Sequence, residues 1–510
     1  MVVNLSKSCL TGLVFVAVTF GSQSPRTEFA EFDIGIGIDL GLGGKPSTGA
    51  GRVDKAQLDH TLKSLAEIAI DNGGNRAFGL PGFDKSVEFI ESSLAKFDSK
   101  KAFKVWKQPF EAMFTHVMTH RLNVTETESY VPQTLTYSPS TPAGGVTAEL
   151  AVVPGNATPC NGEELAATGA NVTGKILLIE RGSCPDGTTF AGKVKTAKAG
   201  GAIAAIIFNS QDAFITGGTL TAPNPEYVPA GLIQRAQGLA LRERALAGEK
   251  LIVEYEQIQV LENRTTTNIF AETKAGDPEN LIMLGAHLDS VQAGPGVNDD
   301  GSGSTLILEL FRTLDAKHVK NKVRFAWWGA EENGLLGSKF FTENLSAEEI
   351  NDLLLYLNFD MVGRGYYGVF DGDGDTYGLA GPPGSDVIET LFHEFFESVN
   401  ITVTPAVFTG GSDYRHFMED LNKPVGGLHT GTGVDQDPCY HQACDGYENV
   451  NQTQLYYNTL AAQTVLAKLI KDGADIIPKN KTTEFRQSKL LFNSGNTFEF
   501  MGCGHDHDKL

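Results

Sequence analysis

The sequence predicts an α/β fold: a three-layer sandwich with a mostly parallel central sheet, preceded by a separate inserted β-rich module. Two observations support this. Between about residues 268 and 472, apolar runs typical of buried strands alternate with amphipathic helical patterns. Between about residues 138 and 254, short strand-like runs occur without the later clustering of acids and histidines. A chain of 510 residues is long enough for two or three domains with their own cores.

The composition is that of a globular protein, with 41% hydrophobic and 20% charged residues. There are 62 acidic and 41 basic residues, which gives a formal net charge of -21. Nucleic acid is itself a polyanion and repels such a surface, so no nucleic-acid partner is expected.

The N-terminus has the parts of a secretory signal peptide. Lys7 precedes an apolar run, Cys9 to Phe20, which ends at small residues. The run is too short to cross a bilayer comfortably, so we expect residues 1–22 to be a cleaved signal and no membrane span elsewhere. Residues 23–52, which are rich in glycine, are predicted to be a leader or pro-segment. A secreted protein is expected, with a vacuolar or lysosome-like lumen as the alternative.

Cysteines and glycosylation sequons fit that route. The cysteines beyond the signal suggest two local disulfides in an oxidising compartment, Cys160 with Cys184 and Cys439 with Cys444. Cys503 is left over in a C-terminal tail, residues 476–510. The N-x-S/T sequons expected of a glycoprotein are at Asn123, Asn156, Asn171, Asn263, Asn344, Asn400, Asn451 and Asn480.

The first two domain segments are each marked by periodicity. Residues 53–137 begin with two helical patterns separated by a glycine-rich turn, and strand-like alternation follows. Residues 138–255 form the inserted module. The predicted elements are helices near Leu58–Ile70 and Val87–Phe97, a strand at Phe103–Phe110, strands at Val146–Val153, Lys175–Ile179 and Gly201–Phe208, and a helix at Phe190–Ala199.

Residues 256–475 hold the main sheet. Its predicted strands are Leu281–Leu284, Lys322–Trp328, Leu353–Phe359 and Val425–Leu428, and its predicted helices cover Leu306–Leu314, Ser385–Val399 and Gln454–Ile470. A turn-forming cluster, Asn298–Gly303, opens the first of these helices.

Acids and histidines follow three of these strands. His287 and Asp289 come after the first strand, Glu331 and Glu332 after the second, and Asp360 after the third. Parallel strands place their C-terminal ends along one edge, so these side chains are expected to converge there. Imidazole nitrogen and carboxylate oxygen suit zinc. Ordinary loop polarity explains any one of these residues, but not readily all of them, and the sequence therefore predicts a metal centre.

A further donor is expected from the loop between Cys439 and Cys444. If these cysteines are bonded, the short loop fixes the directions of Tyr440 and His441. Without the bond, His441 is an ordinary surface residue.

Several ordered motifs resemble those of the secreted and vacuolar zinc aminopeptidases of the aminopeptidase Y type. They are HLDS, NDDGSG, GAEENGLLGS, NFDMVG, GGSDYRHF and DPCYHQACD. The stretch RGSCPDGTTFAGKVKTAKAGGAIAAIIFN resembles the protease-associated domain that many of these enzymes carry, and NGGNRAFGLPG resembles their N-terminal region. The likeness covers about residues 53 to 472.

The resemblance implies a metal site with two Zn²⁺ ions about 3.5 to 4 Å apart. Asp299 is expected to bridge them. His287 and Asp360 are expected to complete one site, and Glu332 and His441 the other.

The resemblance also implies catalytic roles. Glu331 is expected to be the general base, Tyr440 to donate to the oxyanion, and Asp289 to orient His287. It further implies a cis peptide bond after the bridging Asp299.

The expected activity is removal of N-terminal residues from peptides with a free amine. The alternatives are a carboxypeptidase or dipeptidase of the same clan, which needs a cationic group for the substrate carboxylate, and a metal-free receptor-like relative. Glutaminyl cyclases share the fold but are expected to use one metal. The sequence does not indicate an oligomeric state.

Overall fold

The computed structural model describes residues 51–155, 157–212 and 217–480. The predicted signal peptide, nearly all of the predicted leader and Cys503 lie outside these ranges. Among the described helices, none combines the length and apolar character needed to cross a membrane.

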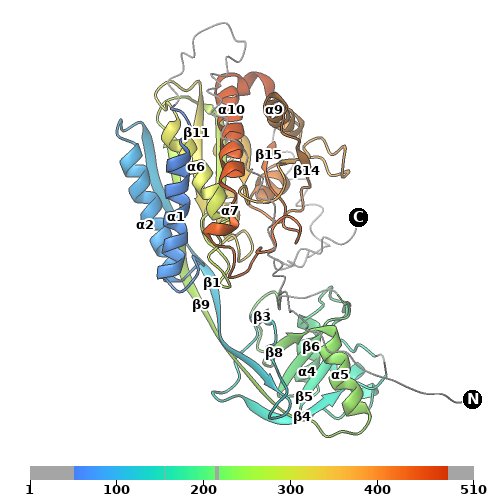
Figure 1. Ribbon diagram of the computed structural model, residues 1–510. Coiled ribbons are helices and arrows are strands. Elements are labelled where there is room, and N and C mark those ends of the chain that lie inside the picture. The colour runs from blue at the N-terminus through green and yellow to red at the C-terminus, as the bar shows by residue number, and fades with distance from the viewer. Residues whose placement is uncertain (1–50, 156, 213–216, 481–510) are drawn as a thin grey trace, which may run out of the picture. The chain divides into compact units, whose positions relative to one another are not determined.

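A largely parallel sheet forms the centre of the fold, as predicted (Figure 1). Strands β10, β11, β12 and β15 run parallel, whereas β9 is antiparallel to β11 and β13 is antiparallel to β15. The order in this part of the sheet is β14 (Thr404–Ala406), β13 (Gly368–Phe370), β15 (Val425–Leu428), β12 (Leu353–Phe359), β10 (Asp277–His287), β11 (Asn321–Trp328) and β9 (Ile252–Thr273).

Helices cover both faces of this sheet, which gives the predicted three layers. Side chains alternate between the faces along each strand. Ile282 and Leu284 of β10 belong to a core shared with α1 (Lys55–Asp71), α2 (Pro81–Phe97), α6 (Gly301–Thr313), α9 (Ser385–Ser398) and α10 (Gln452–Ile476). Leu281 and Met283 belong to a second core, with α7 (Leu336–Glu343), α8 (Ala347–Asp352) and the π-helical turn His416–Asp420.

Two long strands connect this sheet to the inserted module. β1 (Phe103–Asn123) pairs antiparallel with β9 along its length, with one irregularity between Val117 and Thr119. The sequence predicted only Phe103–Phe110. One face stays buried at Ala112 and Phe114, and beyond Phe114 most side chains on both faces are half-buried, so the apolar alternation fades there. Arg121 stabilises this part across the strands, with ion pairs of 2.7 Å to Glu254 and 2.9 Å to Glu256.

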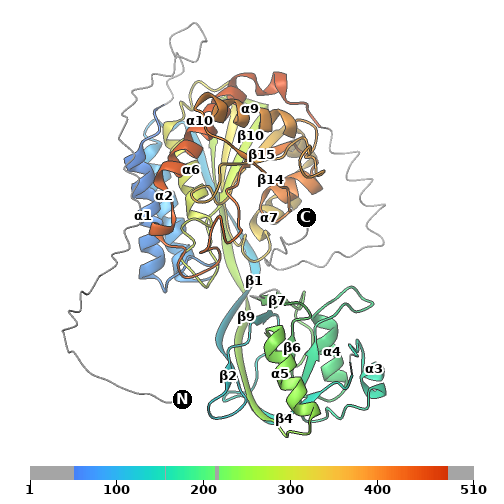
Figure 2. The same ribbon diagram turned by 45° about the vertical axis from the view of Figure 1, so that its right-hand side comes forward.

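The strands of the inserted module continue the sheet beyond β9, which pairs antiparallel with β4 (Val146–Val152) (Figure 2). The module has apolar cores of its own. Its parallel strands are β4, β5 (Ile176–Glu180), β6 (Ala204–Phe208) and β8 (Ala230–Ile233); β3 (Thr134–Thr136) and β7 (Gly217–Thr219) form a separate pair, and β2 (Ser129–Tyr130) pairs with β1.

Helices add to the predicted β-rich module. They are α3 (Gly162–Ala167), α4 (Ala191–Ala199) and α5 (Arg235–Leu246), of which only α4 was predicted. β6 begins three residues later than predicted, because Gly201 adopts a left-handed conformation, φ +82°, in the turn that follows α4. Both predicted disulfides are present, Cys160–Cys184 and Cys439–Cys444.

Candidate metal centre

The C-terminal ends of three neighbouring strands meet at one edge of the sheet. His287 is the last residue of β10, Glu331 and Glu332 follow β11, and Asp360 directly follows β12. Asp299 comes from the loop before α6, and His441 from the loop closed by the Cys439–Cys444 disulfide. The predicted donors therefore lie together, although they come from five separate segments.

Asp299 lies between the two imidazoles. Its Oδ1 is 3.1 Å from Nε2 of His287, and its Oδ2 is 3.2 Å from Nε2 of His441. Asp360 Oδ1 is 3.6 Å from the first imidazole nitrogen, and Glu332 Oε2 is 3.0 Å from the second. The result is two groups of three donors that share Asp299, each with its donor atoms within 4.8 Å of one another.

The donor set fits divalent cations on two further observations. Oε1 of Glu332 is buried and has no hydrogen-bond partner among the described residues, which is the position of an oxygen that a cation would satisfy. Burial opposes the charged imidazolium of His287, yet Glu331, Asp299 and Asp360 outweigh it and raise the pKa of His287 well above its ordinary value. The centre thus has excess negative charge, which positive ions would neutralise.

Glu331 lies beside these groups without belonging to either of the two that share Asp299. Its Oε2 is 3.8 Å from His287 Nε2, and its side chain is almost fully buried. A carboxylate at this distance can exchange a proton with a molecule bound between the donors.

Asp289 holds the chain on both sides of the centre. Its Oδ1 accepts from the main-chain N–H of Glu331 at 3.1 Å, and its Oδ2 from that of Glu332 at 3.2 Å. Nδ1 of His287 contacts the main-chain carbonyl of Asp289 at 3.0 Å, whereas the carboxylate is 3.8 Å away. The main-chain carbonyl of Asp289 therefore orients His287, while the carboxylate of Asp289 positions Glu331 and Glu332. Burial raises the pKa of Asp289 to about 6.

Asp300 joins α6 to the strand ends. As the N-cap of α6, it accepts at Oδ1 from the N–H of Gly303 at 2.8 Å and from that of Met361 at 3.1 Å. Its Oδ2 accepts from the N–H of His287 at 3.1 Å. The Asp299–Asp300 peptide bond is cis, as the resemblance implies.

Two supporting residues were not predicted from the sequence. Asp445 accepts from the main-chain N–H groups of Asn298 and Asp299, both at 3.0 Å. Asp437 accepts at Oδ2 from the Asn298 amide at 2.7 Å. Both acids flank the Cys439–Cys444 loop, which was the available signal.

Arg76 connects the turn between α1 and α2 to the loops of the metal centre. Its guanidinium is fully buried and donates to the carbonyl of Gly296 at 2.7 Å, in the loop that leads to Asp299. Its main-chain N–H donates to Oγ of Ser290 at 2.9 Å. The turn between α1 and α2 therefore holds the loop that leads to Asp299 in place.

Left-handed backbone conformations cluster at this centre. Ala330 (φ +60°), Met361 (φ +52°) and His441 (φ +56°) all have positive φ. Each lies within two residues of a donor or is itself a donor. Such conformations are costly for non-glycine residues and concentrate at functional sites.

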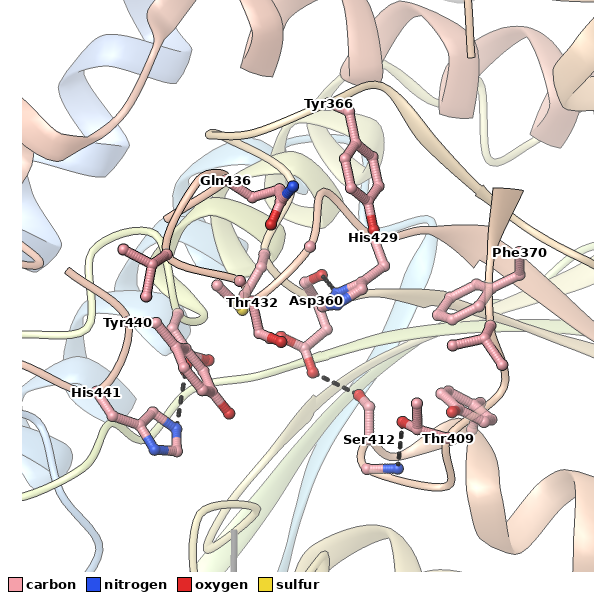
Figure 3. A pocket seen from close by; sticks show the side chains of 18 of the residues that line it. Asp360, Tyr366, Phe370, Thr409, Ser412, His429, Thr432, Gln436, Tyr440 and His441 are labelled. Atoms are coloured by element: carbon pink, nitrogen blue, oxygen red, sulfur yellow. Dashed lines mark hydrogen bonds and ion pairs between the residues drawn. The ribbon is translucent and has the colours of Figure 1, made fainter. Parts of the chain in front are cut away.

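A cavity of about 590 Å³ opens over the donors (Figure 3). Tyr440 lines it and stacks on the His441 ring, with 3.9 Å between ring centroids. Ser412 contacts Asp360 from the other side, with its Oγ 2.5 Å from Oδ2. The apolar and aromatic part of the wall includes Met361, Tyr366, Phe370, Tyr377, Val407 and Val434.

Comparison with known proteins agrees with this architecture. Residues 268–465 match the model of peptidase family M28, and residues 146–241 match that of the PA domain. Leucine aminopeptidase 2 of Trichophyton rubrum is 37% identical over 453 residues, covering 84% of this chain and 86% of that protein. The probable leucine aminopeptidase 2 of Aspergillus fumigatus is 38% identical over 437 residues, covering 82% and 83%.

Among solved structures, an aminopeptidase from Aneurinibacillus sp. strain AM-1 superposes with a TM-score of 0.65 at 27% identity, covering 85% of this chain and 96% of that one. Fold and matches together define a peptidase with an inserted PA domain. The chain belongs to peptidase family M28.

Proposed function

We propose that this protein is a zinc-dependent aminopeptidase that holds two Zn²⁺ ions per chain and removes N-terminal residues from peptides. The observation that supports it most is the position of Asp299, which offers one carboxylate oxygen to each of two imidazoles. The relatives named above are a leucine aminopeptidase and a probable leucine aminopeptidase, and a zinc aminopeptidase from Bacillus subtilis has a similar fold.

In this proposal His287, Asp299 and Asp360 hold one ion, and Asp299, Glu332 and His441 hold the other. The donor atoms are nitrogen and oxygen, which zinc accepts readily in sites of low coordination number. Zinc, when bound, polarises the substrate carbonyl and makes water acidic near neutral pH.

The chain's own groups then move protons and stabilise charge. Glu331 accepts a proton from the attacking water and returns it to the leaving amine. Tyr440 donates a hydrogen bond to the oxyanion, a type of contact that contributes about 3 kcal/mol in other enzymes. Asp289 keeps Glu331 and Glu332 in place through their main-chain amides.

Substrate selection has two parts. The carboxylates of Glu331 and Asp360 face the cavity and attract the free α-ammonium. The wall formed by Met361, Phe370 and Val407 is apolar and suits a leucine-like N-terminal side chain, in keeping with the names of the relatives.

We further propose that the protein is secreted as a glycoprotein, with residues 53–137 and 256–475 forming the peptidase domain and residues 138–255 the PA domain. Two disulfides support an oxidising compartment. Exposed sequon asparagines support glycosylation; they are Asn171, Asn263, Asn344, Asn400 and Asn451.

The test is hydrolysis of aminoacyl-nitroanilides and of the same substrates with blocked amines, with and without a zinc chelator. We expect activity on free amines only, lost with the chelator and restored by Zn²⁺. Cleavage of blocked substrates would overturn the aminopeptidase assignment and favour the carboxypeptidase alternative. Full activity in zinc-free protein would overturn the metal mechanism.

A further inference from the structure

A second group of carboxylates lies apart from the histidine-containing centre. Strand β13 ends at Phe370, and the loop that follows has the sequence DGDGDTY, residues 371–377. Asp371 and Asp373 of this loop and Glu389 of α9 each offer a carboxylate oxygen, and these oxygens lie within 4.8 Å of one another.

Asp371 is the unusual member of this group. Its side chain is 1% exposed, and its Oδ2 accepts from the main-chain N–H of Tyr377 at 3.0 Å. Its Oδ1 is buried without a hydrogen-bond partner among the described residues. A buried carboxylate oxygen without a partner is energetically costly, because it loses its hydrogen bonds to water on folding and forms none within the protein.

The group also lacks a compensating positive charge. Within the described ranges, no lysine or arginine forms an ion pair with these three acids. The nearest basic side chain in contact is His393 of α9, whose Nε2 is 3.7 Å from Oε1 of Glu389. Three carboxylates held this close repel one another, so a bound cation would stabilise the arrangement.

We propose that Asp371, Asp373 and Glu389 form a calcium site. The donors are all oxygen atoms, the ligands that hard cations take, and calcium accepts six to eight of them in irregular geometry. Asp373 is exposed, so water molecules can complete the shell. Asp371, Asp373 and Asp375 share the D-x-D-x-D spacing of known calcium loops, but Thr376 stands where those loops have glycine, and the distant acid comes from a helix.

Oε2 of Glu389 already anchors the loop. It accepts from the main-chain N–H of Gly372 at 2.9 Å and from that of Asp373 at 3.2 Å. The resulting geometry is dictated by the loop and the helix, which suits calcium better than magnesium, since magnesium requires near-ideal octahedral coordination.

The site has a direct connection to the cavity over the metal centre. The loop begins immediately after Phe370 and ends at Tyr377, and both residues line that cavity. Tyr377 is held by its main-chain bond to Asp371 and by its hydroxyl, which donates to the carbonyl of Pro405 at 3.2 Å. A calcium ion would therefore fix one wall of the substrate pocket without contacting the reacting groups.

The test uses full-length, zinc-loaded protein freed of calcium by dialysis. We titrate CaCl2 up to roughly 10 mM, above the weak dissociation constants of extracellular calcium sites, and measure the melting temperature and the calcium and zinc bound per chain. We expect one calcium ion per chain and a rise in melting temperature of roughly 2–4 °C. The Asp373→Asn and Glu389→Gln variants should lose both effects and keep their zinc.

The matched control is Glu394→Gln, which removes an exposed acid from the same helix outside the group. It should respond to calcium like the unaltered protein. If Asp371→Asn fails to fold, the Asp373→Asn variant, which changes an exposed residue, still tests whether the group binds calcium. No calcium-dependent shift, an equal shift in Asp373→Asn, or an equal shift with MgCl2 would each overturn the proposal.

A kinetic measurement tests whether calcium binding affects the substrate pocket. If calcium fixes Phe370 and Tyr377, its removal should raise KM for an apolar aminoacyl-nitroanilide severalfold with a smaller change in kcat. An unchanged KM would overturn that link. The melting and binding measurements do not require activity, so failure of the proposed peptidase function would be distinguished from failure of the calcium site.

Discussion

Asp445 accepts a hydrogen bond from the main-chain N–H of Asp299, the residue that lies between the two imidazoles. The distance is 3.0 Å, and the other oxygen of Asp445 accepts from Asn298 at the same distance. Because Asp445 directly follows Cys444, this contact ties the His441 loop to the Asp299 loop.

We expect Asp445→Asn to weaken zinc binding. An asparagine amide can accept from one of the two main-chain donors but must place its own N–H₂ against the other. Loss of such a supporting contact costs about 10–100-fold in metal affinity in other sites. Competition with a chromogenic chelator measures it. Unchanged affinity would show that the disulfide loop holds Asp299 without this acid.

Glu331→Gln should reduce kcat by roughly 10²–10⁴-fold, because glutamine cannot accept the proton of the attacking water. Zinc content should remain that of the unaltered protein. Elemental analysis beside steady-state kinetics checks both. The control is Glu348→Gln, an exposed residue on α8, which should keep full activity. Near-normal kcat in Glu331→Gln would remove Glu331 from the mechanism.

Tyr440→Phe should reduce kcat by about 10²-fold and leave KM little changed, since a donor to the oxyanion acts mainly in the transition state. Phenylalanine can keep the stacking on His441, so the change isolates the hydroxyl. A variant with unaltered kcat would indicate that Tyr440 only packs.

Replacing Cys439 and Cys444 with serine should weaken zinc binding and activity together, because the loop that carries Tyr440 and His441 loses its closure. The matched control replaces Cys160 and Cys184, which close a loop in the PA domain. That control should retain its zinc and its kcat even if its melting temperature falls. Equal zinc loss in both variants would argue against a local effect.

His120 of β1 should make the protein less stable in acid. Burial lowers its pKa from 6.5 to about 4, so the folded state favours the neutral ring. The unfolded chain then binds more protons as the pH falls from 6.5 to about 4, and stability is lost across that window, by up to about 3 kcal/mol. Urea unfolding at pH 7 and pH 4.5 measures the change, which should shrink in His120→Gln and persist in a variant of the exposed His318.

Much of the metal centre was predictable because the apolar runs mark buried parallel strands, and the C-terminal ends of such strands lie at one edge of the sheet. The runs ending at His287, Trp328 and Phe359 are apolar and parallel, so their C-terminal ends had to meet. The Cys439–Cys444 pairing was predictable from its short spacing.

Other parts left a weaker sequence signal or none. Asp445 and Arg76 act through main-chain N–H and C=O groups of distant loops, and the residue type alone does not indicate such a partner. Helix α5 buries only Gly238 and Leu241 and has almost no amphipathic signal. The outer part of β1 is half-buried on both faces, so its alternation is weak.

The antiparallel register of β1 and β9 has a consequence for engineering. Glu111 lies opposite Thr265, and every pair from Phe103–Thr273 to that point is in continuous register. Cutting the chain at such a pair and joining the two ends by a two-residue type I′ turn would produce an ordinary β-hairpin in place of the whole insertion. The PA domain can therefore be gained or deleted at a hairpin tip without altering the strand order around the candidate metal centre.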